Sequence, residues 1–92
     1  MLSNLNLTDY LDSVEVTWES ETFQRCSEEY VVNLYVNYEL ESTATTREFN
    51  HVFDHEAAPC NLITIEVIAM VNGVSQSIIS SNYEPGMRGR SR

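Results

Sequence analysis

The sequence contains no lysine. Its 92 residues include 14 Asp and Glu but only five basic residues other than histidine, and all five are arginine. Three of these arginines lie in the last five residues, so residues 1–86 carry 14 acids against two arginines, a formal charge of −12. A surface of this sign repels a phosphate backbone, a heparin-like polyanion and an anionic membrane. We therefore expect no nucleic-acid partner.

Glycine and long apolar runs are also scarce. With three glycines the chain has no glycine-rich phosphate loop, and it has no nucleophile motif and no histidine at a recognised spacing from a serine or cysteine. We expect neither an enzyme nor a cofactor. No run approaches the roughly 20 apolar residues that span a bilayer, so no membrane insertion is expected. The first ten residues lack the features of a signal peptide.

What the chain does contain is alternation of apolar and polar residues, the pattern of strands with one buried face. Hydrophobic residues make up 42% of the chain, enough for the core of one domain. The pattern predicts six or seven short strands, no helix, and an all-β fold of two stacked antiparallel sheets. The residues expected in its core are Trp18, Tyr30, Val32, Leu34, Ile65, Val67 and Ala69.

Three stretches predict details of this sandwich. One face of residues 62–71 is apolar and the other is half apolar, so we expect a central strand that is covered on both sides. Asn72 and Gly73 tolerate the positive φ of a tight hairpin, which predicts a turn into the last strand. Glu41–Thr46 is interpreted as an exposed loop or an edge strand, and Tyr35 and Tyr38 are placed on opposite faces of one strand.

The order of these features resembles the fibronectin type III domain. Trp18 is followed twelve residues later by Tyr30, then by Val67-x-Ala69 and by Gly73-x-Ser75, over residues 3–83. The resemblance implies an immunoglobulin-like sandwich of about seven strands over residues 1–86. Residues 87–92 would then form a tail, either a linker or a cloning remnant. An immunoglobulin-like or cadherin-like sandwich is the alternative, although Trp18 precedes the first cysteine.

One departure from the family concerns the start of the sixth strand. The family usually has a tyrosine there, and Ile63 occupies the equivalent position. That corner must therefore be held in another way. The resemblance also places Cys26 and Cys60 at opposite poles of the sandwich. Three hypotheses stay open for them: a disulfide within the domain, free thiols, or bridges to neighbouring domains.

Other polar motifs carry weaker hypotheses. Asn6-Leu7-Thr8 is an N-glycosylation sequon. Residues 51–60 gather His51, His55 and Cys60 with two acids, but residues four apart on a strand stand about 13 Å apart. We therefore interpret that stretch, and the Glu28-Glu29 pair, as solvated side chains and expect no metal site.

The resemblance implies a non-catalytic interaction or spacer module from the extracellular region of a receptor or adhesion protein. The expected partner is another protein, a basic one if charge complementarity decides, or a neighbouring domain of the same chain. The contact residues expected at one pole are Glu21, Phe23, Arg25, Asn72 and Gly73. An accessory linker domain of a secreted enzyme and an intracellular structural domain with reduced cysteines are the alternatives. The sequence does not predict an oligomeric state.

Overall fold

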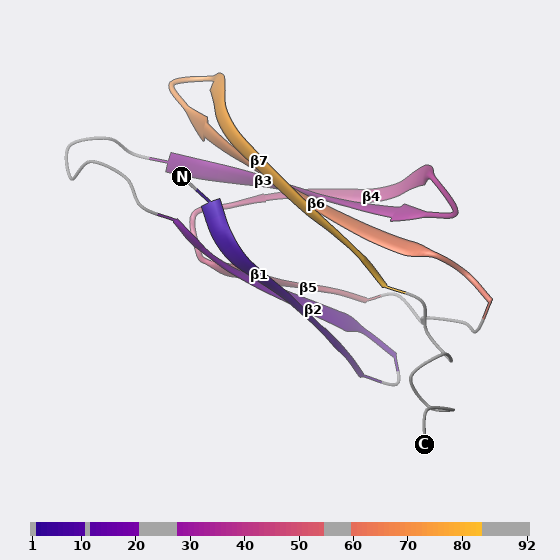
Figure 1. Cartoon of the computed structure of the whole chain (residues 1–92). Coiled ribbons are helices and arrows are strands. Elements are labelled where there is room, and N and C mark those ends of the chain that lie inside the picture. Colours follow the sequence, from indigo (N-terminus) through magenta and orange to yellow (C-terminus); the bar gives the residue numbers. More distant parts are fainter. Residues whose placement is uncertain (1, 11, 21–27, 55–59, 84–92) are drawn as a thin grey trace.

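The computed structural model describes residues 2–10, 12–20, 28–54 and 60–83. These residues form seven strands in two antiparallel sheets that pack face to face (Figure 1). The strands are β1 (Leu2–Asp9), β2 (Val14–Ser20), β3 (Glu28–Val36), β4 (Glu39–Thr46), β5 (Asn50–Phe53), β6 (Ile63–Val71) and β7 (Val74–Tyr83). The predicted all-β sandwich of about seven strands is confirmed.

The sheets contain three and four strands. One has the order β1-β2-β5 and the other has the order β4-β3-β6-β7. The sandwich is closed along one side, where β1 lies beside β7: the Leu2 backbone N–H donates to Ser77 Oγ over 3.2 Å, and the Tyr83 hydroxyl is hydrogen-bonded to Asp9. Because Leu2 lies beside Ser77 and the later residue Asp9 lies beside the later residue Tyr83, β1 and β7 run in the same direction.

The core lies between the two sheets and is built from the alternating faces of β2, β3 and β6. All seven side chains expected there are buried, together with Leu2, Val14, Val16, Phe53 and Ile63. The Trp18 and Tyr30 rings meet edge to face with centroids 5.5 Å apart, a geometry that aromatic pairs favour. Trp18 comes from one sheet and Tyr30 from the other, so this contact joins the two layers.

Tyr30 also brings a polar group into the edge of the core. Its hydroxyl donates to Glu28 Oε1 over 2.6 Å, and the Ser20 hydroxyl donates to the same oxygen over 2.8 Å. Burial, and then the hydrogen bond to Glu28, raise the pKa of Tyr30 to about 12. A phenolate there would lose solvent and face a carboxylate, so the neutral hydroxyl is favoured.

Two hairpins turn through residues with positive φ. In the β6–β7 turn φ is 54° at Asn72 and 79° at Gly73, as the Asn-Gly pair predicts. In the β3–β4 turn φ is 52° at Asn37 and 72° at Tyr38. The placement of Tyr38 on a strand was therefore wrong. Asn-Tyr is not a usual turn pair, because a bulky side chain is strained in the left-handed region.

Asn37 stabilises the approach to β6, where the fibronectin type III family usually has a tyrosine and this chain has Ile63. Its backbone N–H donates to the Leu62 carbonyl over 2.8 Å, and its Oδ1 accepts from the Leu62 N–H over 2.9 Å. Its Nδ2 donates to Asn61 Oδ1 over 3.0 Å. These bonds tie the β3–β4 turn to the approach to β6, while Ile63 is fully buried in the core.

Strand β6, residues 41–46 and Phe49 each differ from, or narrow, what the sequence predicts. β6 is central, but it is covered on one face only: its outward residues Thr64, Glu66, Ile68 and Met70 are partly exposed. The apolar outward residues gave a false signal of a second covering layer. Residues 41–46 belong to an edge strand, β4, so the loop alternative is wrong. Phe49 precedes β5 and is half exposed, although its ring lies 5.6 Å from that of Tyr30.

Candidate interaction surface

Of the five predicted contact residues, Asn72 and Gly73 lie in the part of the chain that the structure describes. Asn72 and Gly73 are exposed at the tip of the β6–β7 hairpin, which extends beyond the body of the sandwich in Figure 1. Glu21, Phe23 and Arg25 lie outside the described residues, as does Cys26. The hairpin tip formed by Asn72 and Gly73 is therefore uncharged.

Two other positions singled out in the sequence, Cys60 and Asn6, are exposed. Cys60 is exposed and carries a free thiol, so the structure contains no disulfide at this position. Asn6 is exposed on β1, and its Nδ2 donates to the Asn4 carbonyl over 3.3 Å. The described residues include no cluster of three or more His, Cys, Asp or Glu that could hold a metal ion. His55 and Glu56 lie outside the described residues.

The His51 ring packs against an aromatic side chain. It lies edge to face against Phe53 with centroids 4.5 Å apart. Burial lowers the pKa of His51, and the nearby negative charge of Asp54 opposes this shift. The neutral imidazole is therefore the form that fits beside Phe53.

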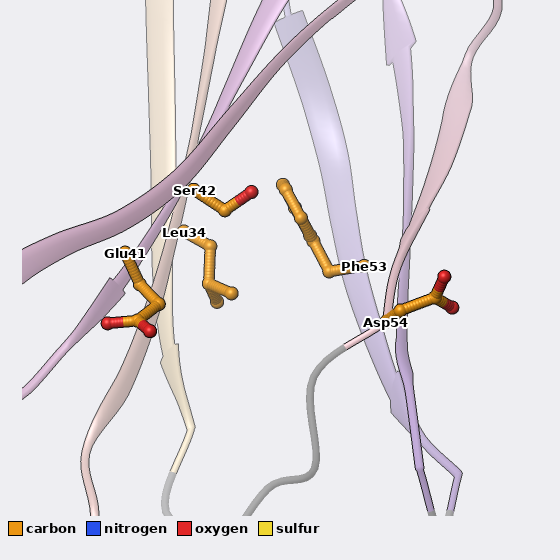
Figure 2. Close-up of a pocket in the computed structure, with 5 residues that line it drawn as sticks. All are labelled: Leu34, Glu41, Ser42, Phe53 and Asp54. Carbon is orange, nitrogen blue, oxygen red and sulfur yellow. The ribbon is translucent and has the colours of Figure 1, made fainter.

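A small cleft opens between the sheets on the side where β4 and β5 are edge strands (Figure 2). It has a volume of about 220 Å³ and is lined by Leu34, Glu41, Ser42, Phe53 and Asp54. The Ser42 hydroxyl and the Phe53 ring point toward each other, and the two carboxylates lie on opposite sides. Pockets for drug-sized ligands have about 300–1,000 Å³, so this cleft is too small for such a ligand.

The outer face of the four-stranded β4-β3-β6-β7 sheet points away from β1, β2 and β5 in Figure 1. The register sets its side chains in rows across the four strands. One row, here named the apolar row, contains Val31, Ile68 and Ile78, with Thr45 at its end. What we call the polar row contains Thr43, Asn33, Glu66 and Ser80. A third row contains Leu40, Tyr35, Thr64 and Asn82.

Hydrogen bonds fix the side chains around Glu66. Asn33 Nδ2 donates to Glu66 Oε1 over 3.0 Å, and the Tyr35 hydroxyl donates to the same oxygen over 3.2 Å. The Thr43 hydroxyl in turn donates to Asn33 Oδ1 over 2.5 Å. Burial, and then the charge of Glu66, raise the pKa of Tyr35. The chain of donors gives the Glu66 carboxylate a defined orientation on the central strand.

The apolar row lies next to this network. Val31 and Ile68 are partly exposed, and Ile78 on the edge strand β7 is 59% exposed. Neighbouring strands are about 4.8 Å apart and successive rows on one face about 7 Å apart, so Ile68 lies one row from Glu66. The face thus presents an apolar band and a fixed negative charge within reach of one long side chain.

Positive charge is scarce around this face. Arg47 is the only Lys or Arg in the part of the chain that the structure describes, and it pairs with Glu29 at 3.1 Å. Both partners of that pair are well exposed. Among the described residues, no Lys or Arg pairs with Glu66. The acidic composition predicted a basic partner, but the sequence alone did not indicate this face.

Comparison with known protein families, with curated proteins and with solved structures finds no match for this chain. The described residues also include no helix long and apolar enough to cross a membrane.

Proposed function

We propose that this chain is a non-catalytic interaction and spacer module, similar to a fibronectin type III domain, from the extracellular region of a receptor or adhesion protein. The Trp18–Tyr30 contact across the two sheets supports the resemblance, since both residues belong to its motif. The Val67-x-Ala69 segment lies on the buried face of β6, and Gly73 forms the hairpin that precedes Ser75.

The place of β4 bears on the alternative. In the constant-type immunoglobulin arrangement the fourth strand joins the sheet of the first, second and fifth strands. Here β4 pairs with β3, and the sheet of β1, β2 and β5 has three strands. The strand order therefore favours the fibronectin type III resemblance over the constant-type immunoglobulin one.

The direction of the first and last strands suits a spacer. β1 and β7 run in the same direction along the closed side of the sandwich, with Leu2 beside Ser77 and Asp9 beside Tyr83. The polypeptide therefore starts β1 at one pole and leaves β7 at the opposite pole. Neighbouring domains joined at these two ends would follow one another along the strand direction, with the sandwich as the rigid unit between them.

The observation that carries the contact function is the outer face of the four-stranded sheet. Its hydrogen-bonded side chains are partly exposed and already held in place, so binding would cost little additional side-chain entropy. Protein contact surfaces combine apolar side chains at their centre with polar groups around them.

A binding screen tests this proposal. The domain would be produced by secretion, assembled into tetramers and applied to an array of secreted and cell-surface ectodomains. We expect saturable binding to at least one basic ectodomain, and weaker binding at higher salt because the chain is acidic. A complete absence of binding across the array would contradict the contact function.

A further inference from the structure

We propose that the outer face of the β4-β3-β6-β7 sheet binds a protein partner that lays an arginine across the apolar row, with the guanidinium on Glu66. This inference rests on the proposed contact function and specifies its surface and its partner chemistry. The occupant is an arginine with an adjacent apolar side chain, presented by a basic protein surface.

The carboxylate of Glu66 is prepared for such a ligand. Both of its hydrogen bonds within the domain end on Oε1, and no described residue donates to Oε2. The donors Asn33 and Tyr35 hold the group in place without neutralising it. With two donors already on Oε1, the remaining acceptor sites of the carboxylate are on Oε2, and the planar guanidinium can direct its N–H groups there. A guanidinium is also less strongly hydrated than a lysine ammonium, so it fits a fixed and partly buried carboxylate better.

The apolar row accommodates the rest of the ligand. The aliphatic stem of an arginine packs on apolar surface while its charged end reaches a polar partner. Ile68 lies one row from Glu66 on the same strand, and Val31 and Ile78 flank it on β3 and β7. Ile78 is the most exposed of the three, so a neighbouring apolar side chain of the partner would cover it.

Charge argues against a second copy of this chain as the occupant. Two copies would bring together formal charges of −9 each, and the only Lys or Arg among the described residues is already paired with Glu29. A basic partner gains the attraction that a second copy would lose. No donor within the described residues holds the Glu41 or Asp54 carboxylate at the cleft as Asn33 and Tyr35 hold Glu66, so Glu66 is the preferred position.

The test is an NMR titration of the isotope-labelled domain with the peptide acetyl-Leu-Arg-Leu-amide. Acetyl-Leu-citrulline-Leu-amide, which has nearly the same shape and no charge, is the control peptide. The variants are Glu66→Gln, which keeps an oxygen for Asn33 and Tyr35, and Ile78→Thr. The control variants are Glu41→Gln on the β4 edge and Val52→Thr, which alters an exposed residue of the other sheet.

We expect the arginine peptide to bind with a millimolar dissociation constant and to shift signals of Val31, Glu66 and Ile68. Glu66→Gln and Ile78→Thr should each weaken binding about fivefold, while the control variants and the folded spectrum stay unchanged. No binding, binding that maps elsewhere, or equal binding of the citrulline peptide would overturn this inference. If ectodomains bind in the array but the peptide maps elsewhere, the contact function stands and only this surface is rejected.

Discussion

The Asn37 corner makes a prediction whose size follows from the structure. Asn37→Ala removes two side-chain hydrogen bonds, to the Leu62 N–H and to Asn61, and leaves an alanine at a φ of 52°. The bonds are exposed, so together they contribute about 1 to 2 kcal/mol. The left-handed conformation costs alanine about 1 kcal/mol more than asparagine. We expect a loss of about 2 to 3 kcal/mol in the free energy of unfolding.

The β6–β7 hairpin supplies the matched control. Asn72 has nearly the same φ, 54°, but its side chain makes no hydrogen bond within the described residues. Asn72→Ala should therefore lose only the conformational part, about 1 kcal/mol. Asn37→Gly should recover that same part and leave the loss of the two hydrogen bonds, because glycine tolerates positive φ.

Urea unfolding followed by Trp18 fluorescence measures all of these variants in one assay. The indole is buried between the sheets, so its emission reports loss of the core. Equal losses for Asn37→Ala and Asn72→Ala would refute the reasoning, because the Asn61–Leu62 contacts would then contribute nothing. Full recovery in Asn37→Gly would refute it in the same way.

Three further predictions concern single side chains. Tyr38 is 80% exposed at a φ of 72°, so Tyr38→Gly should stabilise the domain by about 0.5 to 1 kcal/mol in urea unfolding, whereas Tyr38→Ala should give no gain. The pKa of Tyr30 rises from 10.0 to about 12 on folding, so its contribution is fully present below pH 10 and is lost as the pH rises toward 12. The loss is at most about 3 kcal/mol, and Tyr30→Phe should lack it when unfolding is compared at pH 9 and pH 11.5. Folding lowers the pKa of His51 from 6.5, so the neutral imidazole contributes stability above pH 6.5, and that contribution is lost as the pH falls below 6.5. His51→Gln should remove this part of the acid sensitivity of unfolding. An unchanged pH profile of stability in His51→Gln would contradict the assignment.

The sequence predicts most of this fold because alternation directly encodes which face of a strand is buried. Val32 and Leu34 on β3, like Ile65 and Val67 on β6, are buried as the pattern predicts. The prediction that β6 is covered on both faces was wrong, because Ile68 and Met70 on its outward face are apolar and yet only partly covered. Alternation reports the chemistry of a face and does not show whether a second layer covers it.

The candidate site could be predicted only in its chemistry. The acidic composition indicates a basic partner, but the pairing of Asn33 with Glu66 depends on the register of β3 against β6, which no local pattern encodes. The Asn37 corner escaped prediction for a related reason. Asn-Tyr gives no standard turn signal, and the bonds from Asn37 to Asn61 and Leu62 join segments about 25 residues apart.

A double-mutant cycle between Glu66 and the arginine of the peptide tests the central claim most directly. Dissociation constants would be measured for the wild-type domain and Glu66→Gln, each with acetyl-Leu-Arg-Leu-amide and with its citrulline counterpart. We predict that either single change weakens binding about fivefold and that the second change then adds little, so the two sites are coupled. Independent, additive effects of the two changes would show that the arginine does not bind Glu66 and would contradict the account.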